Sequence, residues 1–103
     1  MADMEEAVKF LLTKEKERRV LEALSIGQKS FTELRDEAGL KYNEELSRAL
    51  KNLQRYVLYD HVYKKKKDQA FSYYELNSLG KETLRITHEV EAHIRKQKKK
   101  IPA

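Results

Sequence analysis

The sequence contains no cysteine and only three glycines, and these shortages exclude several kinds of chemistry. A chain without cysteine forms no disulfide, no thiolate metal site and no cysteine redox sensor. The scattered glycines make no glycine-rich phosphate loop and no nucleophile elbow. No spacing of carboxylates, or of a nucleophile and a base, indicates a catalytic site. We therefore expect a protein that is not an enzyme, with no catalytic residues and no cofactor.

Long apolar runs are also missing, and the chain begins with acidic residues. A membrane-spanning helix needs about 20 apolar residues, and a signal peptide begins with positive charge. We therefore expect a soluble cytoplasmic protein with no membrane partner. His61, His88 and His93 are the only histidines. Although Glu89 and Glu91 lie near the last two, His88 and His93 are five residues apart and do not share a helix face, so no metal site is expected.

Charge is distributed unevenly along the chain. Residues 1–40 carry 7 Lys/Arg and 9 Asp/Glu, a net charge of −2, whereas residues 41–103 carry 15 Lys/Arg and 8 Asp/Glu, a net charge of +7. A basic segment beside a nearly neutral one indicates a polyanionic partner such as nucleic acid. A solvated lysine-rich surface is the alternative, because such surfaces also occur in thermostable proteins.

Both ends of the chain are predicted to be helices with an apolar face. The last helix follows a cap at Asn77 or Ser78, ends in a basic tail, and is stopped by Pro102. It is too long for so small a domain, and its spacing is too irregular for a regular coiled coil. We therefore expect pairing with a second copy of the chain. The predicted interface of this homodimer consists of Met4, Val8, Leu11, Leu12, Leu84, Val90 and Ile94.

Between the two ends, the sequence first predicts two short helices. Thr13 is expected to cap one of them, and Gly27 to end it. Residues 29–31 form at most a very short strand. Ser30 begins a capping box that starts a brief second helix, which ends at Gly39.

A longer helix, about residues 43–56, follows and has two different faces. The apolar stripe consists of Leu46, Leu50, Leu53 and Val57. The polar and mostly basic stripe consists of Glu44, Arg48, Lys51 and Arg55, with Ser47 beside it. A helix in the major groove of DNA needs this division, because its buried face fixes the position while its N-terminal residues meet base edges. An ordinary amphipathic surface helix is the alternative.

The segment 57–76 predicts a β-hairpin. Residues 57–63 and 70–76 alternate and are rich in Val, Tyr, Leu and Phe, which favours strands. The polar residues from Lys64 to Gln69 are predicted to form the turn between them. A hairpin is marginally stable alone, so it must pack beside the helices as a wing. Because adjacent lysines repel one another, contact with phosphates is favoured over a solvated loop.

Three passages resemble winged helix-turn-helix transcription regulators of the MarR, HxlR and PadR kind, over about residues 14–90. Lys29-Ser-Phe-Thr-Glu-Leu-Arg35 is similar to their strand-to-helix passage, and Leu46-Ser-Arg-Ala-Leu-Lys-Asn-Leu53 to their recognition helix. Tyr73-Tyr-Glu-Leu-Asn-Ser-Leu-Gly-Lys81 is similar to the phrase Tyr-x-Leu-Thr-x-x-Gly that ends the wing. Together with the patterns above, the resemblance implies a mainly α fold with a small β-hairpin wing (α+β). Its parts would be an N-terminal helix (1–12), a DNA-binding domain (13–77) and a C-terminal dimerisation helix (78–103).

The resemblance further implies a homodimer on nearly palindromic double-stranded DNA. One recognition helix of each subunit would enter the major groove, and the wing would contact the backbone or the minor groove. Base edges would be contacted by Asn43, Glu44, Ser47 and Arg48. Phosphates would be contacted by Lys41, Tyr42, Lys51 and Arg55, and from the wing by Lys64, Lys65, Lys66 and Lys67.

The sequence also departs from this pattern. Tyr56 stands where such families commonly have glycine after the recognition helix, and the N-terminal cysteine of the HxlR group is absent. Glu44 and Glu45 would repel phosphate. Acids stabilise a helix N-terminus, and Glu44 is alternatively an acceptor for a cytosine amino group. Two other functions stay open: an architectural DNA-binding protein with little sequence preference, and a winged helix that contacts proteins. The sequence predicts no particular small-molecule effector.

Overall fold

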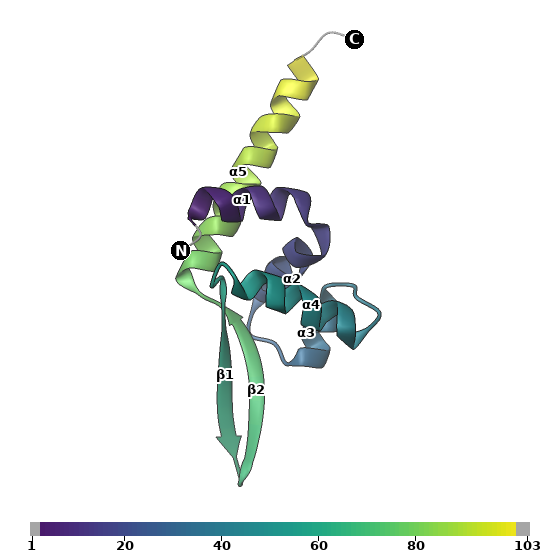
Figure 1. Cartoon of the computed structure of the whole chain (residues 1–103), viewed down its shortest axis with the longest axis vertical. Helices are drawn as coiled ribbons and strands as arrows, with labels where there is room; N and C mark the ends of the chain where they lie inside the picture. The colour runs from purple at the N-terminus through teal and green to yellow at the C-terminus, as the bar shows by residue number, and fades with distance from the viewer. Residues whose placement is uncertain (1–2, 101–103) are drawn as a thin grey trace.

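The computed structural model describes residues 3–100, which form five helices and one antiparallel pair of strands (Figure 1). In chain order these elements are α1 (Met4–Thr13), α2 (Glu15–Ile26), α3 (Phe31–Glu37), α4 (Asn43–Gln54), β1 (Tyr59–Lys66), β2 (Gln69–Leu76) and α5 (Ser78–Lys100). The predicted α+β class is therefore confirmed. The expected helix stop at Pro102 lies outside the described residues.

The connection between the first two helices differs from the prediction. Asp3 caps α1, because its side chain accepts a hydrogen bond from the N–H of Glu6 at 2.9 Å. Thr13 does not cap α2. It is the last residue of α1, and its hydroxyl donates to the carbonyl oxygen of Phe10 at 3.1 Å. α2 therefore starts without a side-chain cap, and Gly27 follows its last residue, as predicted.

The hydrophobic core lies between α1, α2, α3 and α4 and reaches the start of the hairpin. Burying one such side chain stabilises the fold by about 1.5–3 kcal/mol, so apolar packing holds these helices together. α1 is part of this core, because one of its leucines is fully buried. The large apolar side chains that are at most 1% exposed are Leu11, Val20, Leu21, Leu34, Leu46, Leu53 and Leu58.

Local signals in the sequence explain α3 and the turn after it. The predicted capping box is present: the Glu33 N–H donates to the Ser30 hydroxyl at 3.3 Å, and the Ser30 N–H donates to the Glu33 carboxylate at 3.0 Å. Gly39 adopts a left-handed conformation with φ 71°, which glycine does without steric cost. Before α3, Lys29 and Tyr74 exchange two backbone hydrogen bonds of 3.0 and 2.8 Å, so the predicted short strand is a single β-bridge.

α4 has the two faces that the sequence predicted, with one correction at its end. Leu46, Leu50 and Leu53 are buried, as expected from the apolar stripe. Val57 was assigned to the same stripe, and this is wrong. It lies beyond the last residue of α4, has a left-handed φ of 54°, and leaves its side chain 53% exposed. The helical period does not continue through a residue with positive φ.

The hairpin is longer, and its turn tighter, than the sequence predicted. β1 and β2 pair antiparallel over their full lengths. Only Lys67 and Asp68 form the turn, and both have positive φ (47° and 67°), as in a type I′ turn. The predicted turn from Lys64 to Gln69 is therefore wrong, because Lys64–Lys66 are strand residues. Ladder hydrogen bonds come from the backbone, so a run of lysines does not prevent pairing.

The first turn of α5 holds the connection between α4 and β1. The side-chain oxygen of Asn77 accepts a hydrogen bond from the Gly80 N–H at 2.7 Å, which confirms Asn77 as a cap. Its amide nitrogen donates to the carbonyl oxygen of Val57 at 2.7 Å. Gly80 lies so close to Leu58 that a Cβ would come within 2.0 Å of the Leu58 carbonyl oxygen. Asn77 and Gly80 thus fix the left-handed turn at Val57.

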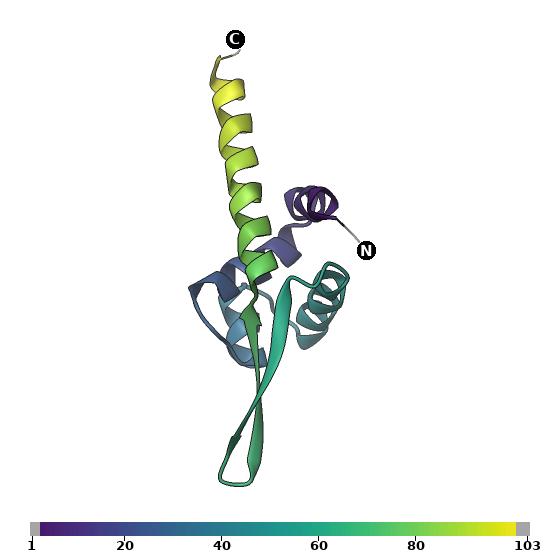
Figure 2. The ribbon, with the colours of Figure 1, turned by 90° about the vertical axis from the view of Figure 1, so that its left-hand side faces the viewer.

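α5 leaves the domain along its long axis, and its second half projects beyond the other elements (Figures 1 and 2). The molecule accordingly measures 63 × 30 × 21 Å. The face toward the domain includes two fully buried threonines, Thr83 and Thr87. Each hydroxyl donates to the carbonyl four residues earlier, at 2.7 and 2.8 Å. Two large apolar side chains of α5, Leu79 and Ile94, are 42% and 43% exposed.

Candidate nucleic-acid interface

The polar face of α4 points away from the core. Ser47, Arg48, Lys51 and Arg55 are exposed, whereas the leucines of the same helix are buried. Within residues 3–100, no hydrogen bond or ion pair engages the guanidinium of Arg48. An α-helix with its side chains is about 10–12 Å wide, and the major groove of B-DNA is about 12 Å wide. The exposed face of α4 therefore has the width and the hydrogen-bonding groups to enter that groove.

The two acids at the start of α4 differ in their surroundings. The Glu45 carboxylate accepts a hydrogen bond from the Tyr42 N–H at 3.2 Å and lies 2.8 Å from the Lys16 ammonium. Lys16, followed by the Tyr42 N–H, holds the pKa of Glu45 below its usual value. Glu45 therefore stabilises the start of α4, as expected of an acid at a helix N-terminus. Glu44 is exposed on the outward face.

Arg35 on α3 organises the N-terminal end of α4, and sequence reasoning missed it. One guanidinium nitrogen donates to the side-chain oxygen of Asn43 at 2.7 Å, and another nitrogen lies 3.1 Å from Asp36. Asn43 is thus held with its oxygen occupied, which leaves its amide nitrogen as the free donor. Lys41 and Tyr42 are exposed beside it. The sequence signal for this contact was only that Arg35 is a basic residue in the last turn of α3. Its partner, Asn43, is eight residues away and lies beyond a turn.

The four wing lysines do not act as one cluster. In the ladder, Lys65 shares a face with His61 and Tyr63, whereas Lys64 and Lys66 lie on the opposite face. The Lys64 ammonium donates to the Gln28 side chain at 2.7 Å and lies 5.3 Å from the centre of the Tyr73 ring. Lys64 is therefore directed back toward the domain. Lys65, Lys66 and Lys67 are exposed in the outer part of the hairpin.

A groove separates the outward face of α4 from the inner face of the wing. Its exposed lining residues are all polar or basic, and no carboxylate is among them. The Tyr59 hydroxyl closes its inner end by donating to the Leu50 carbonyl oxygen at 3.1 Å, and burial raises the pKa of this hydroxyl. The buried or half-buried lining is formed by Phe31, Leu50, Tyr59 and Tyr74, and the exposed lining by Ser47, Lys51, Gln54, Arg55 and His61.

A second, apolar groove lies between α1 and α5, far from the wing. It is lined by Met4, Val8, Leu12, Ile86 and Val90, together with the stems of Glu5 and Lys9. Four of the seven residues predicted for the dimer interface therefore lie together here. Leu11 and Leu84 do not belong to this surface, because they are buried in the core of the single chain at 1% and 4% exposure. Ile94 is exposed on the projecting part of α5.

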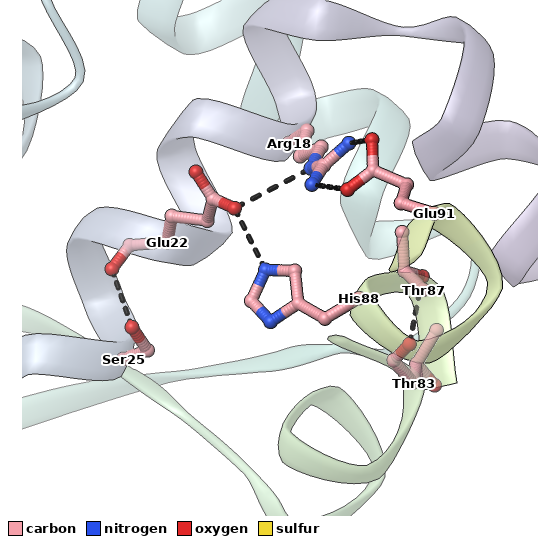
Figure 3. Close-up of polar contacts among 7 residues, drawn as sticks. All are labelled: Arg18, Glu22, Ser25, Thr83, Thr87, His88 and Glu91. Carbon is pink, nitrogen blue, oxygen red and sulfur yellow. Dashed lines mark hydrogen bonds and ion pairs between the residues drawn. The ribbon is translucent and has the colours of Figure 1, made fainter. Parts of the chain in front are cut away.

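Polar contacts fasten α5 to α2 (Figure 3). Both terminal guanidinium nitrogens of Arg18 donate to the two carboxylate oxygens of Glu91. The Arg18 Nε lies 3.4 Å from Glu22, and the His88 Nε2 lies 2.8 Å from the same Glu22 oxygen. The hydrogen bonds from Arg18 hold the pKa of Glu91 below its usual value. The side chains of Arg18 and Glu91 are only 19% and 24% exposed, so water screens this pair less than a surface pair.

Two other kinds of site can be assessed over the same residues. Among residues 3–100, no group of three or more His, Cys, Asp or Glu side chains is placed to hold a metal ion. In this part of the chain, no helix combines the length and the hydropathy that crossing a membrane requires.

The sequence matches no protein-family model and no curated protein. Solved structures, however, share its fold. The transcriptional regulator YodB from B. subtilis, in its diamide-treated form, is 21% identical over 89% of this chain and 90% of that chain, with a TM-score of 0.75. A PadR family transcription regulator from Clostridium difficile is 18% identical over 81% and 93% of the two chains, with a TM-score of 0.69. The homodimeric winged helix-turn-helix DNA-binding domain of Mb0332 from Mycobacterium bovis, a possible ArsR-family regulator, is 16% identical over 98% and 87%, with a TM-score of 0.63. These similarities show that the chain has the winged helix-turn-helix fold that its sequence motifs predicted.

Proposed function

We propose that this protein is a transcription regulator that binds double-stranded DNA sequence-specifically as a homodimer. One observation carries the proposal: α4 buries its leucines and presents Ser47, Arg48, Lys51 and Arg55 to solvent, beside a basic hairpin. This arrangement suits a helix in the major groove and a wing on the neighbouring backbone. The two transcription regulators and the DNA-binding domain of a possible regulator that share the fold support the proposal.

The exposed residues of the N-terminal half of α4 are assigned to base edges. Arg48 is the leading candidate, because a guanidinium binds the O6 and N7 atoms of guanine in a bidentate manner. Asn43, Glu44 and Ser47 complete the set, and Arg35 orients Asn43. Phosphate contacts are assigned to Lys41, Tyr42, Lys51 and Arg55 on the helix and to Lys65, Lys66 and Lys67 on the wing. Lys64 is assigned a lesser role than the sequence suggested, since it contacts Gln28.

The apolar groove between α1 and α5 is assigned to the dimer interface. Its half-buried side chains, Met4, Leu12, Ile86 and Val90, would be covered by the same groove of a second copy, whereas Val8 is already buried within one chain at 7% exposure. A two-fold interface of this kind is self-complementary, and two identical subunits would read a palindromic site. The structurally similar Mb0332 domain is described as homodimeric, which supports this assignment.

An architectural protein with little sequence preference is the second candidate function. The exposed lysines on both faces of the wing favour it, because they contact phosphates and carry no base information. Exposed Glu44 would favour the third function, protein contact, since a carboxylate on the outward face of α4 repels phosphate.

Selection of bound fragments from a random double-stranded pool distinguishes these functions. The selection is made at about 0.15 M salt, where exposed charges are screened beyond about 8 Å. We expect enrichment of an inverted repeat, whose half-site spacing gives the distance between the two recognition helices. Retention without enrichment would support the architectural function. A folded protein that retains no DNA would overturn both DNA-binding functions.

A further inference from the structure

An imidazole stands at the open side of the groove between α4 and the wing. The His61 ring is stacked on Tyr74 of the opposite strand, with ring centres 4.4 Å apart and an angle of 11° between the planes. Its Nε2 is hydrogen-bonded to the Ser72 hydroxyl, and its Nδ1 lies 3.5 Å from the Tyr63 hydroxyl. The ring is exposed, yet these contacts fix its position on the inner face of the wing.

The groups that face His61 across the groove are cationic or neutral. Lys51 of α4 and Arg55, which directly follows that helix, line the groove with it, and the phenols of Tyr59 and Tyr74 form its buried side. Phe31 of α3 adds no charge, and none of the groove's lining residues within the described part of the chain is a carboxylate. A charged His61 would therefore face the two like charges of Lys51 and Arg55 in the free protein. An anion between α4 and the wing would balance these charges.

The proposed binding mode supplies that anion. The major and minor grooves of B-DNA are separated by a sugar–phosphate strand. A domain with α4 in the major groove and the wing beside it would therefore take one strand between them, at the groove that Lys51, Arg55 and His61 line. We propose that this groove holds a DNA phosphate and that His61 lies beside it as a cation, so that DNA binding takes up a proton. This inference rests on the proposed function and adds to it a proton-linked contact.

The consequence is a DNA affinity that rises as pH falls. Imidazole groups change charge between about pH 5 and 8, and no other ordinary side chain does so. Each phosphate neutralised on duplex DNA adds about 0.9 to the negative slope of log K against log salt concentration. The slope is therefore expected to be steeper by about 0.9 at about pH 6 than at about pH 8. Each threefold dilution of the salt is therefore expected to tighten binding about threefold more at the lower pH than at the higher pH.

The chain offers matched controls, because its other two histidines lie on α5. The experiment measures binding of the full chain to a mixed-sequence duplex of about 30 base pairs, about three helical turns. Salt is varied at both pH values. His61→Gln is expected to remove the pH-dependent part of the slope, and His61→Lys to keep the steeper slope at both pH values. His88→Gln and His93→Gln are expected to behave as the wild type does. Circular dichroism at both pH values confirms that each variant is folded.

The outcomes separate this inference from the function beneath it. A folded wild type that binds no DNA at either pH overturns the proposed function and the inference together. DNA binding whose salt slope does not change with pH overturns only the inference. The same holds if the slope changes with pH but His61→Gln keeps that change, because the proton is then taken up elsewhere.

Discussion

Gly80 is the residue whose replacement tests the structure most sharply. It lies in the first turn of α5, where a Cβ would come within 2.0 Å of the Leu58 carbonyl oxygen and 2.7 Å of the Leu76 Cδ1. Cβ atoms in proteins essentially never come closer than 3.0 Å to an atom outside their own residue and its chain neighbours. Gly80→Ala therefore requires α5 and the α4–β1 connection to separate by about 1 Å, a shift expected of an overpacked site. The Leu58 side chain is fully buried, so this backbone has little freedom to move.

Two opposing effects set how much stability Gly80→Ala loses. Overpacking of a tight site costs about 1–3 kcal/mol, and we expect the upper part of that range because the obstructing atom is a backbone oxygen. Alanine in a helix is favoured over glycine by about 1 kcal/mol. The net loss in the free energy of unfolding is therefore about 1–2 kcal/mol. For a domain of this size, that lowers the Tm by about 4 °C or more.

The other two glycines provide the comparison in urea or thermal unfolding at equal protein concentration. A Cβ at Gly27 meets no atom within 4 Å, so Gly27→Ala is expected to change stability by no more than about 0.5 kcal/mol. Gly39→Ala meets only Arg19 at 3.6 Å but must adopt a φ of 71°, which costs about 1–2 kcal/mol. If Gly80→Ala were as stable as Gly27→Ala, the close approach of α5 to Leu58 would be refuted.

Three further predictions concern the connection after α4, the α2–α5 contact and base readout. Val57→Gly removes a left-handed strain of about 1–2 kcal/mol against an entropic cost of about 0.5–1 kcal/mol, so urea unfolding should show a small gain in stability; a loss would contradict the strain. Glu91→Gln should destabilise the protein at pH 7 by about 1.5 kcal/mol. Because the folded-state pKa of Glu91 is lowered, its stabilisation is present above the unfolded value of about 4.3 and is lost as pH falls. Unfolding of Glu91→Gln should therefore approach that of the wild type at acidic pH, and an equal difference at all pH values would argue against the ion pair. Arg48→Ala should lower discrimination between an enriched site and random DNA by about 1–3 kcal/mol in competition binding, whereas an equal loss on both DNAs would indicate a phosphate contact only.

The helices and the hairpin were predictable because their signals are local. Ser30 and Glu33 are three residues apart, and the leucines of α4 follow a period that one segment reveals by itself. The extent of the strands was not predictable in the same way. A run of lysines has no alternation of apolar and polar residues, so nothing marks Lys64–Lys66 as members of a ladder that backbone hydrogen bonds extend. Strand length is therefore underestimated wherever side chains on both faces are polar.

The candidate site was only partly predictable, because it depends on contacts between distant segments. The basic face of α4 follows from helical spacing alone. Arg35 reaches Asn43 only because Gly39 turns the chain between them, and His61 lines the groove only because β1 passes beside α4. Neither Arg35 nor His61 is part of a recognisable sequence motif. The dimer prediction failed at Leu11 and Leu84 for a related reason: an apolar stripe shows that a helix face is covered, but not which surface covers it.

α5 carries the proposed dimer contact and also fixes the position of α4, the proposed recognition helix. The first turn of α5 binds the connection after α4 through Asn77 and Gly80, and its middle is fastened to α2 by the pair of Arg18 and Glu91. In a dimer formed through α1 and α5, the distance between the two copies of α4 would therefore depend on how rigidly α5 is held on its own domain. Weakening the contact between Arg18 and Glu91 should then relax the preferred half-site spacing without touching any DNA-contacting residue. A spacing preference that stayed as narrow in Glu91→Gln as in the wild type would show instead that the first turn of α5 alone determines the geometry.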